Sequence, residues 1–199
     1  MVPFAGWEMP VQYAGVVAEH EAVRKAAGMF DVSHMGELLL RGPHALALVD
    51  HLVSNDVKKL VDGQALYTVC CNAKGTILDD LIIYRRGPEE IVVVCNAGNL
   101  EKISTYFRGA ATGHCDFTDQ SDATALIALQ GPQAVAVMRA AGASEKVLGL
   151  KSFHFADDVI AGAKVTPART GYTGEDGFEI FAPADRAVDV WRALLAAGK

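Results

Sequence analysis

The chain has 199 residues, of which 51% are hydrophobic and 21% charged, and its formal net charge is -6 at pH 7. This composition is typical of a globular protein, and the length suits one large domain or two small ones. The acidic balance and the lack of a Lys/Arg cluster argue against nucleic acid as a partner. A membrane partner is not expected either, because no apolar run approaches the roughly 18 residues that span a bilayer.

The four cysteines are Cys70, Cys71, Cys95 and Cys115, and none forms a Cys-x-x-Cys pair. Their spacing does not match that of metal ligands, so we expect no metal site. They are expected to be buried free thiols in a reducing compartment. The first residues lack the charged region and apolar core of a signal peptide.

In chain order, the sequence first predicts an extended segment over 1–14, which carries prolines and aromatic residues. A helix is predicted over 16–27, with Gly28 as its C-terminal cap. Residues 30–35 are expected to form a short link. The apolar run 36–41 then reads as a strand.

Gly42-Pro43 follows this strand and should begin a helix that runs to about Val53, because proline suits the first helical turn. The same order recurs later, where strand 125–130 is followed by Gly131-Pro132 and a helix over 133–141. Two related strand-to-helix units would explain the recurrence. A similar local turn in two unrelated units would explain it as well.

Further strands are predicted at 65–71, 77–84, 91–95, 115–118, 151–155, 159–160, 165–169 and 178–181, and further helices at 99–107 and 184–197. Strands and helices mix without strict alternation, which favours an α+β fold with mixed or antiparallel sheets and flanking helices.

The segment 75–96 has the pattern of a hairpin, with two apolar runs around a polar turn. Its first strand contains Asp79 and Asp80, although aspartate is depleted in strands. Neighbouring side chains of a strand point to opposite faces, so the two carboxylates cannot face the same space. Either both are solvated or ion-paired, or one is set in an apolar wall that tunes it for chemistry.

The densest motif is Arg169-Thr-Gly-Tyr-Thr-Gly-Glu-Asp-Gly-Phe-Glu179. It could be a tight turn between strands, in which glycine provides conformational freedom. It could instead be a rim that stacks a flat ring on Tyr172 and accepts ring N–H groups on Glu179. It is neither a dinucleotide-binding loop nor a Walker loop, because the glycine register and a Gly-Lys-Ser/Thr sequence are missing.

Several motifs occur together in one order: Pro3-Phe-Ala-Gly-Trp-Glu-Met-Pro-Val-Gln-Tyr13, Phe30-Asp-Val-Ser-His-Met35, Gly75-x-x-x-Asp-Asp80, Cys95-Asn-Ala97 and the 169–179 motif. With them the chain resembles the aminomethyltransferase (T-protein) family of the glycine cleavage system. The resemblance implies a three-domain cloverleaf around a folate channel. Residues 1–45 and 125–199 would form the first, discontinuous folate-binding domain, and 46–124 an incomplete second domain. Family members continue past Lys199 into a C-terminal barrel, so the chain looks like a fragment that lacks the barrel and the arginines downstream.

The resemblance implies a transferase in one-carbon metabolism and glycine catabolism. Its partners are the lipoylated H-protein, which carries an aminomethyl group, and tetrahydrofolate as co-substrate, without a metal. The methylene passes to folate and ammonia is released. Asp80 matches the family's essential aspartate, while Asp79 would face away, so Asp79→Asn is expected to be mild. The matching folate residues are Tyr67, Val94, Asn96, Tyr172 and Glu179.

Two related classes remain as alternatives. One is a non-catalytic folate-binding relative that assists iron–sulfur assembly, which usually carries a cysteine-containing motif where this chain has Arg169-Thr-Gly-Tyr-Thr-Gly-Glu175. The other is the folate domain of a dimethylglycine- or sarcosine-oxidising enzyme, which would have a flavin domain outside this chain. Bacterial cytoplasm is the expected location, and the mitochondrial matrix also fits.

Overall fold

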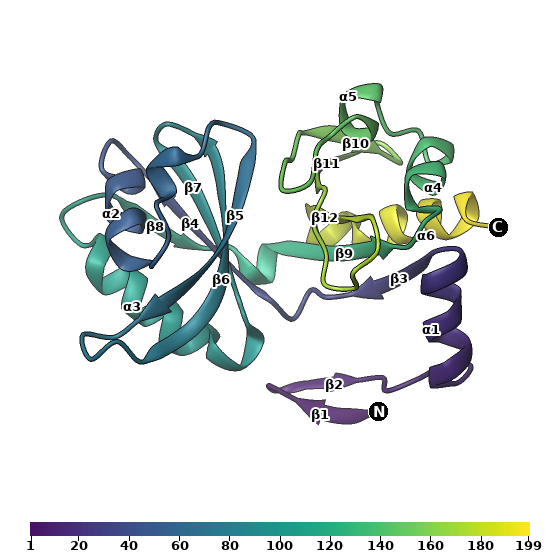
Figure 1. The fold of residues 1–199 in the computed structure, drawn as a ribbon, viewed down its shortest axis with the longest axis horizontal. Helices are drawn as coiled ribbons and strands as arrows, with labels where there is room; N and C mark the ends of the chain where they lie inside the picture. Colours follow the sequence, from purple (N-terminus) through teal and green to yellow (C-terminus); the bar gives the residue numbers. More distant parts are fainter. The chain divides into compact units, whose positions relative to one another are not determined.

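The computed structural model describes all 199 residues, Met1–Lys199. They form two compact units (Figure 1), one made of Met1–Ser33 with Ala123–Lys199 and the other of His34–Asp122. We call the first the discontinuous unit and the second the inserted unit. No helix in either unit is long and apolar enough to cross a membrane.

The first boundary between the units differs from the one expected at residue 45. Strand β4 (Gly36–Arg41) pairs antiparallel with β7 (Glu90–Cys95) and with β8 (Asp116–Asp119), so its hydrogen bonds place it in the inserted unit. The second boundary, between Asp122 and Ala123, lies close to the expected one. The expected boundary followed from the family resemblance alone, and the partners of β4 lie much further along the chain.

The inserted unit is an antiparallel sheet with helices. Its strands have the order β5-β6-β7-β4-β8. The remaining elements are α2 (Ala45–Leu52), the short 3-10 helix η1 (Val57–Lys59), β5 (Gln64–Cys71), β6 (Ile77–Gly87), the 3-10 helix η2 (Ala97–Asn99) and α3 (Leu100–Ala111). The hairpin predicted over 75–96 is present as β6 and β7.

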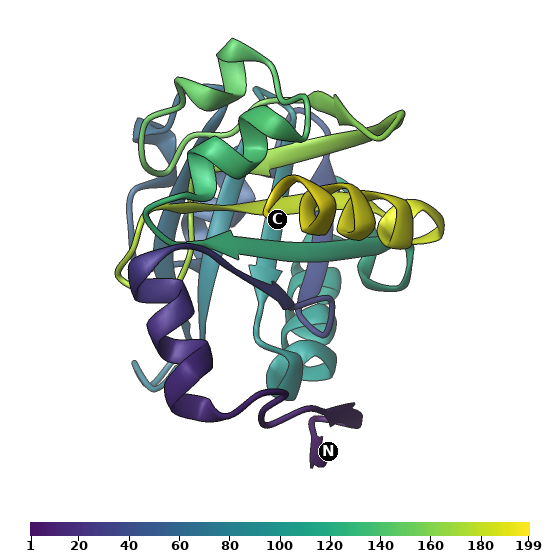
Figure 2. The same cartoon turned by 90° about the vertical axis from the view of Figure 1, so that its right-hand side faces the viewer.

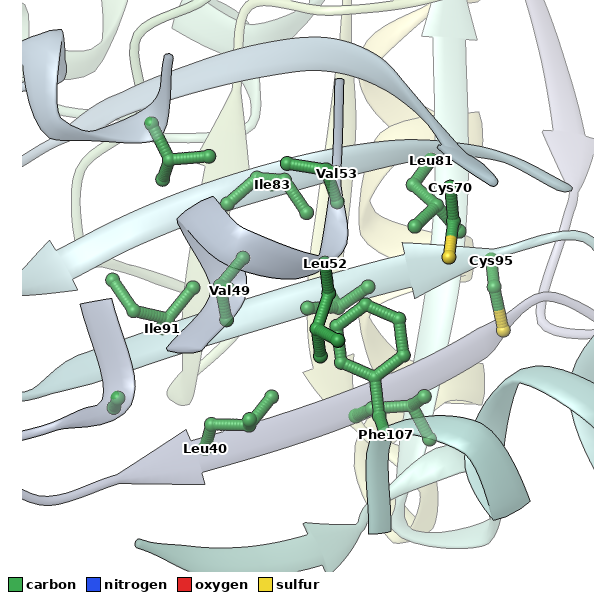
Figure 3. Close-up of a cluster of buried hydrophobic side chains, with 14 of the residues drawn as sticks. Leu40, Val49, Leu52, Val53, Cys70, Leu81, Ile83, Ile91, Cys95 and Phe107 are labelled. Atoms are coloured by element: carbon green, nitrogen blue, oxygen red, sulfur yellow. The ribbon is translucent and has the colours of Figure 1, made fainter. Parts of the chain in front are cut away.

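The core of this unit lies between α2, α3 and one face of the sheet (Figure 3). The ring of Phe107 on α3 is fully buried there, in the same cluster as Val49 on α2 and Ile83 on β6. The thiols of Cys70 and Cys95 belong to this cluster too. Burial raises the pKa of Cys70 to about 11 and that of Cys95 to about 12, so both remain protonated and poor nucleophiles at neutral pH.

The discontinuous unit contains a second antiparallel sheet, in the order β10-β11-β12-β9-β3. Its elements are β1 (Val2–Phe4), β2 (Trp7–Met9), α1 (Val16–Lys25), β3 (Gly28–Asp31), β9 (Thr124–Gln130), α4 (Ala134–Ala140), α5 (Glu145–Leu148), β10 (Asp158–Ile160), β11 (Ala163–Ala168), β12 (Gly177–Pro183) and α6 (Ala187–Ala197), with 3-10 turns η3 (Ser121–Ala123) and η4 (Ala184–Arg186). Helix α6 lies against β12 and β9 (Figures 1 and 2), where Leu194 joins Phe178 and Leu129 in the core.

Three local expectations were wrong. Gly28 begins strand β3 and does not cap α1, which ends at Lys25 with Ala26 as its cap. The expected link over 30–35 therefore starts inside a strand. The strand expected over 151–155 is reduced to a single bridge between Phe155 and Ala168.

The two units share one topology. In each, the strand next to one edge of the sheet (β4 or β9) leads through Gly-Pro into a helix (α2 or α4), three antiparallel strands follow, and a further helix (α3 or α6) comes next. The edge strand beside it is β8 in one unit and β3 in the other. Gly42 and Gly131 have nearly the same left-handed φ, 132° and 129°. This favours two related units over a chance likeness of local turns.

The overall architecture confirms the predicted α+β class, with antiparallel sheets and flanking helices.

Candidate functional site

The two aspartates of β6 lie on opposite faces of the inserted unit's sheet. Asp79 is buried, with 4% of its surface exposed, on the face covered by the helices. Asp80 is exposed. A register shift between Cys70 and Cys71 leaves Leu78 of β6 without a partner, so a bulge directly precedes the aspartates. Bulges occur often beside functional sites, because they re-aim the side chains that follow.

Asp80 shares its face of the sheet with Tyr67 and Val94. Ile82, two positions after Asp80 on the same strand, pairs with Tyr67 of β5 on one side and with Val94 of β7 on the other. Directly paired residues and residues two positions apart point to the same face. Tyr67 is 47% exposed, whereas Val94 is buried.

Both oxygens of the Asp80 carboxylate accept hydrogen bonds from the protein. The Tyr67 hydroxyl donates to Oδ2 at 3.0 Å, and the Asn96 side-chain amide donates to Oδ1 at 2.9 Å. The two donors come from β5 and from the end of β7, so the carboxylate is fixed between elements of the sheet. This arrangement presents an oriented anionic group at an exposed position of the sheet, which suits electrostatic positioning of a substrate.

Asp79 has a different environment. It accepts the backbone N–H of Asn96 at 2.9 Å, the Asn96 side-chain amide at 3.0 Å and the Asn99 side-chain amide. A buried carboxylate is stable when its lone pairs are satisfied in this way. Asp79 therefore fastens β6 to the turn that leads into α3.

In the discontinuous unit, Glu179 lies on β12 and accepts a hydrogen bond from the Thr170 hydroxyl on Oε2. Burial raises the pKa of Glu179, and the Thr170 bond opposes this shift. The other oxygen, Oε1, accepts no hydrogen bond from the protein. A half-buried carboxyl with one open oxygen could accept N–H groups from a ligand.

The glycine-rich loop before β12 is built around Gln130, which sequence reasoning missed. The Gln130 amide donates to the carbonyls of Thr170 at 3.1 Å and Phe178 at 3.3 Å, and it accepts from the Thr173 hydroxyl at 2.9 Å. A Cβ at Gly171 or Gly177 would overlap the Gln130 side chain. The absence of side chains at these two glycines therefore makes room for the buried Gln130 side chain, not for a ligand. In the sequence, the only sign of this role of Gln130 was that a polar residue ends an apolar strand.

Two acids of the same loop are engaged in structural contacts. Asp176 forms a two-pronged ion pair with Arg169, with bonds of 2.9 and 2.6 Å, which lowers the pKa of Asp176. Glu175 pairs with Arg24 of α1 at 2.8 Å. Tyr172 projects from this loop with 99% of its surface exposed. An exposed aromatic on a braced loop is available to stack on a flat ring.

Sequence reasoning also missed a buried carboxyl, that of Glu37. Glu37 on β4 pairs directly with Val94, is only 2% exposed, and neither carboxyl oxygen has a hydrogen-bond partner. Burial, with the nearby charge of Asp119, raises the pKa of Glu37 to about 9. Glu37 is therefore a neutral acid at pH 7. Its position in an otherwise apolar strand was the only sign in sequence.

The structure thus brings together Tyr67, Asp80, Val94 and Asn96 within the inserted unit. Tyr172 and Glu179 belong to the discontinuous unit. Tyr172 lies on the glycine-rich loop before β12, and Glu179 lies on β12 itself. No group of three or more His, Cys, Asp and Glu side chains is arranged to hold a metal ion.

Comparisons with known proteins show which proteins the whole chain is similar to. The chain is 47% identical over 199 residues to a protein named aminomethyltransferase from Shouchella clausii, matching 100% of this chain and 54% of that protein. It also resembles the solved aminomethyltransferase T of the glycine cleavage system from Bartonella henselae, with a TM-score of 0.89, 36% identity and coverage of 98% of this chain and 52% of that one. The chain therefore spans about half the length of the curated relatives it matches.

A more distant neighbour is the heterotetrameric sarcosine oxidase from Corynebacterium sp. U-96, with a TM-score of 0.67 and 17% identity over 91% of this chain and 89% of that one. At this identity the likeness concerns the fold alone. The family described as "GCVT N-terminal domain" matches residues 1–199, and the chain therefore belongs to that family.

Proposed function

We propose that the protein is the aminomethyltransferase of the glycine cleavage system. It would transfer the methylene of an aminomethyl group, carried on the lipoyl arm of the H-protein, to tetrahydrofolate with release of ammonia. The observation that carries the proposal is the exposed Asp80 carboxylate, held between Tyr67 and Asn96. The names of the relatives, together with the match over the whole chain, support it.

Asp80 would act by its charge. When folate N5 forms its bond to the methylene carbon, the carbon–nitrogen bond to the departing amine breaks, positive charge develops at N5, and the amine leaves as ammonia with the N5 proton. Folate N10 would then close the methylene bridge as the carbon–sulfur bond to the lipoyl arm breaks, and the arm would leave as a thiol with the N10 proton. An oriented carboxylate beside N5 stabilises the charge and needs no reorganisation. Neither a protein nucleophile nor a metal is required for this step.

The other predicted residues would bind the pterin. Tyr172 would stack on its flat ring, and Glu179 would accept N–H groups of its amino-pyrimidine edge. Val94 would contribute a backbone contact. We further propose that the two units are the first domain and part of the second domain of a cloverleaf. A bacterial location in the cytoplasm is supported by the bacterial sources of the relatives.

The proposal is tested with the full-length protein, aminomethylated H-protein and tetrahydrofolate. We expect methylene-tetrahydrofolate and ammonia to form in equal amounts, both dependent on the H-protein. A full-length protein that binds reduced folate but oxidises sarcosine or dimethylglycine with an added flavoprotein would instead favour the oxidase class. Folate binding without any turnover would favour a non-catalytic relative.

A further inference from the structure

The side chain of Asn96 lies between the two aspartates of β6. Its amide nitrogen donates to Asp79 Oδ1 at 3.0 Å and to Asp80 Oδ1 at 2.9 Å. The backbone N–H of Asn96 donates to the second oxygen of Asp79 at 2.9 Å. The two carboxylates, which face opposite sides of the strand, are thus linked through one residue.

Only one orientation of the Asn96 amide is compatible with these neighbours. If the amide were turned over, its oxygen would face two carboxylates and both hydrogen bonds would be lost. The observed orientation leaves the Asn96 Oδ1 atom as an acceptor without a hydrogen-bond partner in the protein. This atom is not sealed in the interior either, since the fully buried side-chain atoms that lack a partner belong to Glu37.

Asp79 is itself held firmly. The Asn99 side-chain amide donates to it, and the oxygen of that amide accepts from the Lys102 ammonium at 2.7 Å. Burial of Asp79 removes competing water. Of the two carboxylates that Asn96 contacts, Asp79 is therefore the more constrained, because it is buried and accepts three hydrogen bonds, whereas Asp80 is exposed.

We propose that Asp79 is a positioning residue, which acts through Asn96 to hold the Asp80 carboxylate and to present the Asn96 Oδ1 atom to an N–H group of the substrate. This inference deepens the proposed function and rests on it. The N–H donor belongs either to the reduced pterin or to the amine that leaves. This proposal replaces the expectation, drawn from the resemblance, that Asp79→Asn has a mild effect.

Asp79→Asn is the sharpest variant, because it keeps the shape but turns one of the two acceptor oxygens into an N–H donor. The backbone N–H of Asn96 and the side-chain amides of Asn96 and Asn99 can then no longer all be accepted. An asparagine at this position offers its own N–H groups, which favour the turned-over amide of Asn96. In the full-length protein we expect kcat to fall about ten- to a hundredfold, while the KM for tetrahydrofolate changes less than about threefold. The exposed Glu101→Gln on α3 is the control and should leave kcat unchanged.

A double-mutant cycle separates positioning from a merely structural role. If Asp79 acts through Asn96, the effect of Asp79→Asn on kcat should shrink to less than about twofold in an Asn96→Ala background. A merely structural residue would lower kcat by the same factor in both backgrounds, and that result would overturn the proposal. Should Asp79→Asn fail to fold, Asp79→Glu takes its place, because it moves the carboxylate by one methylene.

A second test measures hydrogen exchange of the Asn96 side-chain amide and does not depend on enzyme activity. The side-chain amide protons of Asn96, assigned in NMR spectra by their loss in Asn96→Ala, should be protected from exchange in the wild type and lose that protection in Asp79→Asn. Unchanged protection would contradict the role of Asp79 whatever the enzyme does. Loss of protection in a protein without methylene transfer would leave the Asp79–Asn96 coupling established and would refute the proposed function instead.

Discussion

Replacing Asp80 with asparagine in the full-length protein is expected to lower the rate of methylene transfer by about a hundred- to a thousandfold. Asparagine keeps the size of the side chain and can still accept the Tyr67 hydroxyl, which now donates to Asp80 at 3.0 Å. What is lost is the negative charge that would stabilise positive charge at N5. The measurement is a single-turnover rate with aminomethylated H-protein and tetrahydrofolate.

Binding of reduced folate should change less than about threefold in the same variant, because the pterin would be held by Tyr172 and Glu179. Asp116→Asn is the matched control, since it removes an exposed carboxylate from another strand of the same sheet. Loss of folate binding in Asp80→Asn would move this residue from catalysis to binding. Undiminished transfer would remove it from the site.

The second large effect is on stability and concerns Glu37. In the folded chain its pKa is raised to about 9 from an ordinary value of 4.5, so the folded state keeps a proton that the unfolded state releases. Stability must then fall as the pH rises between these two values, because the folded state binds more protons. At pH 7, which lies about 2.5 units above the ordinary pKa, the cost reaches up to about 3 kcal/mol.

Glu37→Gln removes this titration and keeps the shape of the neutral acid. We expect the variant to be more stable than the wild type by up to about 3 kcal/mol at pH 7, by more at pH 8, and to show little advantage near pH 4.5. Urea unfolding of the variant and the wild type at several pH values measures the difference in the free energy of unfolding at neutral pH and near pH 4.5. Glu89→Gln, at an exposed position of the β6–β7 turn, is the control. If the Glu37→Gln and wild-type curves ran parallel with pH, Glu37 would not be a buried neutral acid.

The hairpin with its aspartate pair shows what sequence could predict. Alternating periodicity was enough to place Asp79 and Asp80 on opposite faces, because that alternation is a local property of any strand. The Gly-Pro turns after β4 and β9 were also recognised, since glycine adopts backbone conformations that other residues avoid and proline suits the start of a helix. Features that depend only on neighbouring residues, such as the facing of side chains in a strand and the position of a turn, could therefore be predicted from the sequence.

Long-range pairing could not be predicted in the same way. Strand β3 is short and finds its partner in β9, which follows the whole inserted unit. Gln130 gains its role only because the loop before β12 folds around it, and Glu37 is neutral only because its surroundings exclude water. The partners of Asp79 were hidden for a related reason, since Asn96 and Asn99 reach it from beyond the hairpin's second strand.

The most direct test of the account is a calorimetric titration of the full-length protein with a stable reduced folate, beside its Glu179→Ala variant. We predict binding by the wild type and affinity about ten- to a hundredfold weaker in the variant, because the half-buried carboxyl would accept two N–H groups of the pterin. Equal affinity in the two proteins would remove Glu179 from the site. A folded full-length protein that binds no reduced folate would contradict the account as a whole.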